Sequence, residues 1–348
     1  MAQTIPQART AGSHSATPAC SGSRIGQAQC DVLVENVPAI KAGAHPAYGG
    51  WGAPDLEKAY NLPITKGSGN NVFIVDAYDN PDVSSDFNTY RSTMGLPAST
   101  LNKYNQSGQK SNYPQNSPGW GVEIDLDVDM ASAACPLCTI NLVEANSSQW
   151  TDLEAAEQEA VKLGATIISN SYSGTGASES DYDTKGVEYL ASAGDSGISL
   201  IDPATFDSVV AVGGTELSKT SGSRGYSETT WYGSGGGCSS TGEPKPKWQK
   251  KNKYAKSCSY RMGADVSAVA VDAAEYDTDS EGGWIQVDGT SISSPLNAGV
   301  FGLAGNSTSQ DGGKTFWNKK HDKSLYEVGN QRFSDQGGFG SPDGTGAF

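Results

Sequence analysis

The sequence predicts an α/β domain in which helices cover both faces of a mostly parallel sheet. Two observations predict this fold class. Apolar, β-branched segments alternate along the chain with segments of helical periodicity, and the apolar segments carry almost no polar interruptions. Continuous apolar strands are typical of parallel sheets that are buried on both faces. With 348 residues, the chain is also long enough to bury a sizeable core.

The expected elements begin near residue 50. Residues 1–49 are rich in Ala, Gly, Ser and Pro, so we expect a loosely packed arm there and a catalytic domain over 50–348. The expected strands are 70–78, 139–145, 166–173, 208–214 and 283–289. The expected helices are 82–95, 121–134, 151–165, 181–194 and 291–306. Residues 220–258, rich in Gly, Ser and Lys, are expected to form a long surface excursion.

Charge and hydropathy exclude several classes of partner. The chain carries 24 basic and 39 acidic residues, a net charge of −15, which argues against nucleic acid or an anionic membrane as a partner. The sequence contains no apolar run of the length that a membrane span needs. The acidic balance suits a protein that must stay soluble when acid titrates part of its carboxylates.

The six cysteines fall into three pairs that are local in sequence. These pairs favour disulfides Cys20–Cys30, Cys135–Cys138 and Cys238–Cys258. A metal site at the CxxC of 135–138 would need two further ligands, which no second CxxC or HxxxH supplies. A redox CxxC would open a helix after a strand, whereas this one precedes the strand 139–145. Disulfides in an exported protein are therefore the better interpretation.

The stretch GVEIDLDVDMASAACPLC, residues 121–138, spaces four acids by two residues. A parallel sheet needs a crossover between strands 70–78 and 139–145, so we expect a helix here. On a helix, Asp125 and Asp129 lie on a polar face that we expect to be wet, whereas Glu123 and Asp127 lie one turn apart on the apolar stripe. Burial and a like-charged neighbour would raise both pKa values, so this pair would share a proton. The alternative is two acids at the edge of the stripe, or paired with Lys or Arg.

The segment VDGTSISSP, residues 287–295, places Ser291 directly after a strand and at the start of a small-residue helix. Helix N-termini stabilise developing negative charge, so Ser291 is a candidate nucleophile; it could equally be an ordinary helix cap. The three histidines, His14, His45 and His321, lie in contexts that do not fit a catalytic base. A carboxyl with a raised pKa, such as Glu123, could take the same proton at low pH.

These features together resemble the sedolisin family, the serine-carboxyl peptidases, which have a subtilisin-like fold. The resemblance covers residues 50–348 and rests on separated motifs in a matching order. They are GAPDLEKAYNLP (52–63), the E-x-x-x-D helix of 121–136, SAGDSG (192–197), DPATFDSVVAVGGTEL (202–217), GCSSTGEPKPKWQ (237–249), RMGADVSAVA (261–270) and VDGTSISSP. The resemblance implies a subtilisin-like three-layer domain.

The resemblance also implies roles for individual residues. Ser291 would be the nucleophile, Glu123 the general base, Asp127 its partner and Asp195 a donor to the oxyanion. Asp195 could instead simply cap a turn. The segment SNSYSG (169–174) resembles the strand that pairs with substrate, which makes Ser169, Asn170 and Ser171 candidate substrate-binding residues; the alternative is an interior strand. Asp76, at the end of the strand 70–78, is interpreted as structural.

Three departures from the family pattern stand out. An arm of about 50 residues takes the place of the family's large N-terminal prodomain. Asp288 precedes Gly289, where the family usually has glycine. The family's calcium-binding segment corresponds to SLYEVGNQRFSDQGGFGSPDGTGAF (324–348), which has Glu327 and Val328 in an altered pattern and a shortened loop. Because calcium needs six to eight oxygen ligands, we expect this site to be degraded and no cofactor to be required.

The sequence thus predicts a secreted, monomeric serine-type endopeptidase that acts on polypeptide substrates at acidic pH. The main alternative is a catalytically impaired family member that acts as a peptide-binding module. An esterase with the same nucleophile is a second alternative, but the lipase motif G-x-S-x-G is missing.

Overall fold

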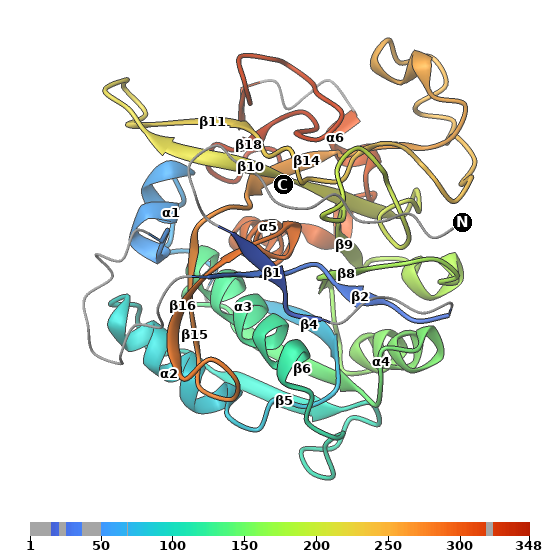
Figure 1. Cartoon of the computed structure of the whole chain (residues 1–348). Coiled ribbons are helices and arrows are strands. Elements are labelled where there is room, and N and C mark those ends of the chain that lie inside the picture. Colours follow the sequence, from blue (N-terminus) through green and yellow to red (C-terminus); the bar gives the residue numbers. More distant parts are fainter. Residues whose placement is uncertain (1–14, 21–25, 37–49, 68, 318–322) are drawn as a thin grey trace.

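A computed structural model describes residues 15–20, 26–36, 50–67, 69–317 and 323–348. Its centre is an eight-stranded sheet in the order β11-β10-β9-β7-β4-β6-β5, with β14 also paired to β10 (Figure 1). All pairs are parallel except β10–β11. The strands are β4 (Asn71–Ala77), β5 (Leu101–Asn105), β6 (Thr139–Ala145), β7 (Ile167–Asn170), β9 (Glu188–Ser192), β10 (Val209–Lys219), β11 (Tyr226–Thr230) and β14 (Val266–Val269).

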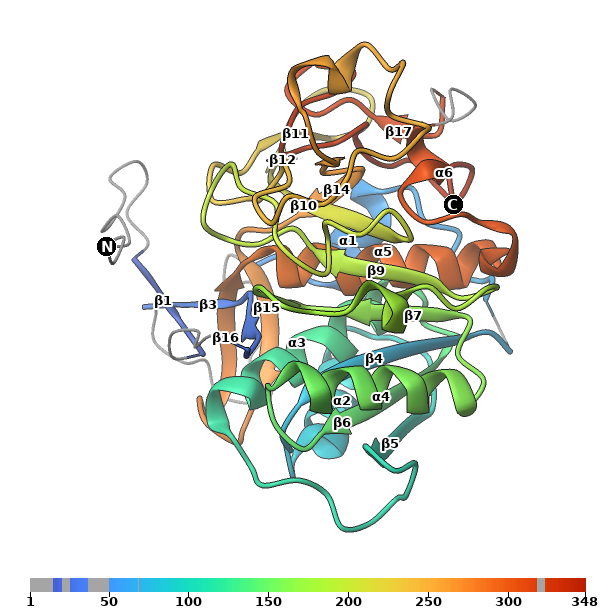
Figure 2. The ribbon, with the colours of Figure 1, turned by 90° about the vertical axis from the view of Figure 1, so that its right-hand side faces the viewer.

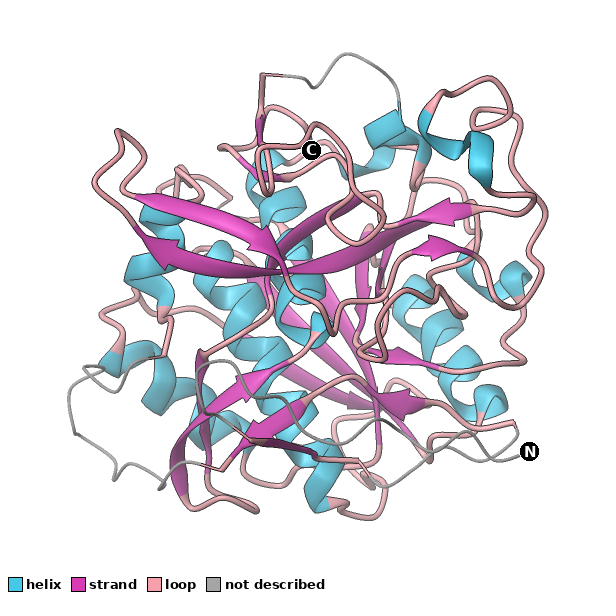
Figure 3. Cartoon of the chain, turned by 45° about the horizontal axis from the view of Figure 1, so that its top comes forward, coloured by secondary structure: helices cyan, strands magenta, loops and turns pink. Residues whose placement is uncertain are grey.

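Helices cover both faces of this sheet, which confirms the predicted fold class (Figures 2 and 3). Helices α3 (Pro118–Ala134) and α5 (Thr290–Ala304) pack against each other on one face, and α1 (Ala53–Ala59) and α2 (Val83–Thr93) flank α3. Helix α4 (Trp150–Lys162) packs on β4 and β6 from the other face. The expected helix over 121–134 is confirmed as part of α3, but it connects β6 to β5, a strand that the sequence analysis did not predict, and not to β4.

A second, antiparallel sheet lies beside α3 in the order β1-β3-β16-β15. Its strands are β1 (Ala16–Pro18), β3 (Leu33–Glu35), β15 (Ala273–Asp277) and β16 (Gly283–Asp288). The expected strand 283–289 is thus a strand of this smaller sheet and not of the central one. It leads directly into α5, so the small sheet and the central layer meet at residue 289.

The predicted helix over 181–194 is wrong. A short 3-10 turn, η1 (Glu179–Tyr182), is followed by strand β9, which lies between β7 and β10. Gly186 has a φ of +87°, which interrupts any helix at that point. The apolar residues after it are buried from both faces of the sheet, so their helix-like spacing does not decide their structure.

The remaining elements are short and lie toward the C-terminal half or the N-terminal arm. They are β2 (Gln29–Cys30), β8 (Tyr172–Ser173), β12 (Gly237–Cys238), β13 (Met262–Gly263), β17 (Leu325–Tyr326), β18 (Ser341–Pro342), α6 (Lys314–Trp317), η2 (Tyr254–Ser257) and η3 (Ser307–Ser309). In the described part of the chain, no helix combines the length and the apolar character of a membrane span.

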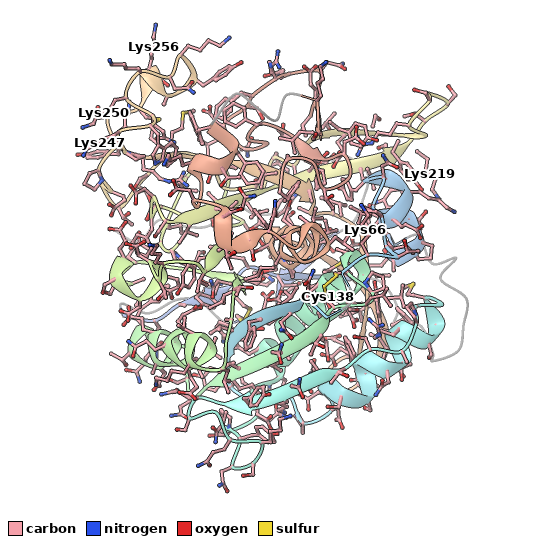
Figure 4. The ribbon with its side chains drawn as sticks, turned by 180° about the vertical axis from the view of Figure 1, so that it is seen from behind. Lys66, Cys138, Lys219, Lys247, Lys250 and Lys256 are labelled. Atoms are coloured by element: carbon pink, nitrogen blue, oxygen red, sulfur yellow. A yellow bond between two sulfur atoms is a disulfide. The ribbon has the colours of Figure 1, made fainter. Side chains whose placement is uncertain are left out.

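All three predicted disulfides are present. Cys20–Cys30, Cys135–Cys138 and Cys238–Cys258 form as the sequence spacing indicates. The second closes the turn that ends α3, and the third closes residues 238–258 of the expected excursion, whose residues 226–230 instead form strand β11 of the central sheet. Lys247, Lys250 and Lys256 project outward from this excursion (Figure 4).

Candidate active site

Ser291 lies in the first turn of α5, where its hydroxyl meets a carboxyl from α3. The Oγ of Ser291 donates a hydrogen bond of 2.9 Å to Oε2 of Glu123, and both side chains are fully buried. The turn before α5 depends on Gly289, because its φ of +140° is a conformation that glycine adopts readily and other residues rarely adopt. The packing of α3 on α5 therefore brings together two residues that are 168 positions apart.

Glu123 and Asp127 form the buried pair that the helical spacing predicts. The two carboxyls lie close enough to influence each other's pKa, and Oδ1 of Asp127 accepts a bond of 2.6 Å from the hydroxyl of Ser171. Burial raises the pKa of Glu123 well above its usual value, and the nearby Asp127 and Asp76 raise it further. Burial likewise raises the pKa of Asp127. The raised pKa values favour a proton on one carboxyl of this pair. Glu123 lies where it can exchange a proton with the hydroxyl of Ser291.

The prediction that Asp125 and Asp129 lie on a solvent-exposed face of α3 is wrong. Asp125 is fully buried and Asp129 is 1% exposed. The reason is that α2 and β15 cover the side of α3 that faces away from the central sheet. Burial raises the pKa of both carboxyls, and Asp125 accepts a hydrogen bond of 2.7 Å from Asn80.

Asp195 follows β9 and points at the turn before Ser291. Its Oδ1 accepts two bonds of 2.8 Å from Thr290, one from the backbone N–H and one from the hydroxyl. Its Oδ2 lies 2.8 Å from the point where a Cβ on Gly289 would be. Burial and the nearby carboxyl of Asp31 raise the pKa of Asp195 well above its usual value, which favours a neutral carboxyl.

The three candidate substrate-binding residues have different surroundings. The hydroxyl of Ser169 bonds that of Ser294 at 2.9 Å, and the amide of Asn170 donates to the carbonyl of Leu190, so both side chains face the interior. Ser171 alone contacts the catalytic candidates. Its carbonyl accepts a bond of 3.3 Å from the hydroxyl of Ser291, in addition to the contact of its side chain with Asp127.

Asp31 is a site residue that the sequence analysis missed. It belongs to the N-terminal arm, whose described part is packed against the domain and not loose as expected. The backbone carbonyl of Asp31 accepts a hydrogen bond of 3.3 Å from the N–H of Ser291. Burial raises the pKa of its side chain to about 6. Only its position next to the paired Cys30 could have drawn attention to it, because the arm has no hydrophobic periodicity.

A group of three carboxyls lies near the same turn. Within the described ranges, Glu35, Asp272 and Asp288 bring carboxylate oxygens close enough to share a cation, and Asp288 also accepts a bond of 3.0 Å from the N–H of Asp272. Burial and the two aspartates raise the pKa of Glu35 to about 9, so a proton on Glu35 lowers the negative charge of this group. The group is compatible with a calcium site but is not evidence for one. In the C-terminal segment, Glu327 is exposed and Val328 is buried.

Comparison with known proteins finds similarity to one peptidase family. The curated protein Sedolisin from Pseudomonas sp. (strain 101) is 24% identical over 257 residues, which cover 62% of this chain and 43% of that protein. The chain thus matches less than half the length of this relative. No family model matches the sequence.

Solved structures agree with this fold. Pseudomonas sedolisin, a serine-carboxyl proteinase complexed with two molecules of pseudo-iodotyrostatin, aligns with a TM-score of 0.71 at 22% identity, over 84% of this chain and 95% of that one. Fervidolysin from Fervidobacterium pennivorans, a keratinolytic enzyme related to subtilisin, aligns with a TM-score of 0.57 at 14% identity, over 94% of this chain and 49% of that one. The subtilisin-like fold is confirmed.

Proposed function

Because the curated relative and the solved structure both support the sedolisin family for this chain, we propose that it is a secreted serine-carboxyl endopeptidase that acts at acidic pH. The observation that carries the proposal is the hydrogen bond of 2.9 Å from the hydroxyl of Ser291 to Glu123. A buried serine that donates to a buried carboxyl at a helix N-terminus has both a base and a favourable place for developing charge. The three disulfides fit an oxidising compartment.

In this proposal the proton moves between Ser291 and Glu123. Ser291 attacks the carbonyl carbon of the scissile bond while Glu123 accepts the proton from its hydroxyl. Glu123 then gives that proton to the leaving amine, and a water molecule hydrolyses the resulting ester by the same route. Asp127 would orient Glu123 through a proton shared between the two carboxyls, and Ser171 fixes Asp127 in turn through the hydrogen bond of its hydroxyl. No cofactor takes part in these steps.

Two donors would stabilise the tetrahedral oxyanion. One is the backbone N–H of Ser291, and the other is the carboxyl of Asp195. Since Oδ1 of Asp195 is occupied by the two donors of Thr290, its proton would reside on Oδ2, the atom that faces Gly289 and the turn before Ser291. A protonated carboxyl can donate there, whereas an ionised one would repel the oxyanion.

The alternative of a peptide-binding module without catalysis is not favoured. A module of that kind would have no need for a serine-to-carboxyl hydrogen bond, yet this bond and the Asp127 contact behind it are complete. Asp288, the unusual residue before Gly289, accepts a hydrogen bond from the N–H of Asp272 and lies beside Glu35.

Hydrolysis of a denatured protein across about pH 2 to 7 tests the proposal. We expect the wild type to release peptides with a maximum in the acidic range and the Ser291→Ala variant to be inert at every pH. Equal, background-level rates for both proteins would refute an enzyme function. A maximum near neutral pH would refute the acidic optimum of this proposal, in which Asp195 must carry a proton to donate to the oxyanion.

Asp195 provides a second test through two substitutions of different chemistry. Asp195→Ala removes one oxyanion donor, so we expect kcat to fall by about 10²- to 10³-fold. Asp195→Asn keeps an N–H donor that does not titrate, so it should recover part of this loss and lose less activity than the wild type when the pH rises. The pH profiles of kcat measure both effects. Equal losses in the two variants with unchanged profiles would show that Asp195 only supports the turn.

A further inference from the structure

Residues 26–36 lie across the candidate active site as an extended chain. Strand β2 pairs antiparallel with β8, with Gln29 opposite Ser173 and Cys30 opposite Tyr172 (Figure 1). The pairing continues to Asp31, whose N–H donates a bond of 3.1 Å to the carbonyl of Ser171. This is the way an extended peptide adds a strand to a sheet edge.

The carbonyl of Asp31 lies among the donors of the site. Its oxygen accepts the N–H of Ser291 at 3.3 Å. The same oxygen lies 2.2 Å from the point where a Cβ on Gly289 would be, and Oδ2 of Asp195 lies 2.8 Å from that point. The carbonyl of Asp31 is therefore next to both groups that would stabilise an oxyanion. Glycine at 289 leaves the space for this approach.

The chain is also held on the other side of the Asp31–Val32 bond. Strand β3 pairs antiparallel with β16, with Leu33 opposite Asp288 and Val34 opposite Val287. Backbone pairing on both sides of one peptide bond fixes its position relative to the nucleophile. A peptide bond that is held in this way loses little further freedom when it reacts, which is what a peptidase requires of its substrate.

The side chain of Asp31 occupies a small polar pocket. Its two carboxyl oxygens accept bonds from the hydroxyls of Ser173, at 2.8 Å, and Ser192, at 2.7 Å. The ionisable groups that influence it from neighbouring elements are the carboxyls of Asp195 and Glu123. A pocket of two hydroxyls with acidic neighbours suits a short, uncharged carboxyl better than an apolar side chain, which would leave the hydroxyls unpaired.

We infer that Ser173 and Ser192 form the specificity pocket of this site, that the peptidase cleaves after aspartate, and that Asp31–Val32 is the bond it cleaves in its own chain. The inference rests on the proposed function and adds the substrate class to it. The Cys20–Cys30 disulfide lies wholly on the N-terminal side of this bond, so cleavage separates residues 1–31 from 32–348 without a covalent tether.

The cleavage is balanced with water as the only co-reactant. The Oγ of Ser291 bonds to the carbonyl carbon of Asp31, and Glu123 takes the hydroxyl proton. The bond from that carbon to the nitrogen of Val32 breaks, and Glu123 returns the proton to this nitrogen. Water then cleaves the ester, which leaves a new carboxyl on Asp31 and restores the hydroxyl of Ser291.

The pH dependence distinguishes an aspartate pocket from a general polar one. The pKa of Asp31 in the pocket is about 6, against 3.8 for a free aspartate. Binding is therefore fully favourable below the lower value and is lost as the pH rises through the higher one. The asparagine side chain of a matched peptide does not titrate. Effects of pH on the enzyme itself therefore cancel in the ratio of kcat/KM for the Asp peptide to kcat/KM for the Asn peptide.

The experiment uses peptides with the sequence of residues 27–36, carrying Cys30→Ser and either Asp, Asn, Glu or Leu at position 31. At pH 4 we expect kcat/KM for the Asp peptide to exceed that for the Leu peptide by at least about tenfold. The Asp-to-Asn ratio should fall by at least about tenfold between pH 4 and pH 6. A preference for Leu, or a ratio that does not change with pH, would overturn the inference.

A Ser192→Ala variant tests the pocket itself. We expect the Asp-to-Leu ratio of kcat/KM to fall by about tenfold, because the variant leaves one oxygen of the bound carboxyl without its donor. Ser180→Ala is the matched control, because the hydroxyl of this exposed serine bonds to that of Ser178, away from the pocket. Equal ratios in wild type and Ser192→Ala would overturn the assignment of the pocket.

Self-cleavage of the full chain is measured after acidification by N-terminal sequencing and by mass spectrometry of the intact protein. The full chain should yield a new N-terminus at Val32, whereas Ser291→Ala should remain intact and Asp31→Leu should be cleaved more slowly at that bond. If the enzyme digests denatured protein but cuts neither at Val32 nor after aspartate, the inference fails and the proposed function stands. If it digests nothing at any pH, both fail.

Discussion

Raising the pH from 4 to about 7.5 is expected to lower the melting temperature of this protein and to drive it toward unfolding. The cause is a set of buried carboxyls that take no direct part in the proposed chemistry. They are Asp76, Asp125, Asp129, Glu157, Glu188 and Glu275. Burial is the largest cause that raises the pKa of each one well above its usual value. In the folded protein these groups are neutral in acid.

The direction of this change in stability with pH follows from the difference between the folded and the unfolded pKa of each carboxyl. The folded pKa of each carboxyl is higher than the unfolded value near 4, so the stability that its proton contributes is fully present below the unfolded value. It is lost as the pH rises through the folded value. One pKa unit corresponds to about 1.4 kcal/mol. A domain has about 5–15 kcal/mol of stability in total, so several such groups together can remove it.

Thermal unfolding followed by circular dichroism at a series of pH values measures this effect. Glu275→Gln should flatten the fall in melting temperature, because an amide does not ionise and Glu275 is surrounded by Asp277, Asp125 and Asp129. The control is Glu327→Gln, since Glu327 is exposed. A melting temperature that rises between pH 4 and pH 7.5 would contradict the expected sign.

Glu123→Gln is expected to reduce kcat/KM by about 10²- to 10⁴-fold at the acidic optimum. The amide oxygen can still accept the hydrogen bond of Ser291, so the geometry of the site should persist. It cannot take the proton, however, and the shared proton with Asp127 is lost as well. Steady-state hydrolysis of a peptide substrate, with folding checked by thermal unfolding, measures the loss.

Asp125→Asn is the matched control for this experiment. It lies two residues along the same helix, is equally buried, and bonds to Asn80 and not to the site. Its activity at acidic pH should stay close to that of the wild type, because this carboxyl is already neutral there. Retention of activity within tenfold by Glu123→Gln would remove Glu123 from the role of base.

Much of the fold and the centre of the candidate site could be predicted from the sequence. The two helices that bear Ser291 and Glu123 were identified because small and apolar residues recur with helical period and because a parallel sheet requires a crossover. The one-turn spacing of Glu123 and Asp127 then predicts their contact. Local patterns of this kind are independent of the rest of the molecule, so they can be read directly.

The errors arose where the partner of a segment is distant in sequence. The polar face of α3 has the same pattern whether water or α2 and β15 cover it, so the burial of Asp125 and Asp129 could not be read from their spacing. Residues 188–192 form a strand because β7 and β10 lie on both sides of them. The role of Asp31 depends on β8 and the turn at Gly289, which lie about 140 and 260 residues further along the chain.

The antiparallel pairing of β2 with β8 has a kinetic consequence. A segment that belongs to the same molecule occupies its partner at an effective concentration of the order of millimolar, whatever the protein concentration. Dilution therefore cannot vacate the candidate site, and a substrate in solution must compete with a segment that stays tethered until the chain is cleaved. Loss of this occupant would follow first-order kinetics, with a half-time that is the same in a dilute secretion as in a crowded vesicle.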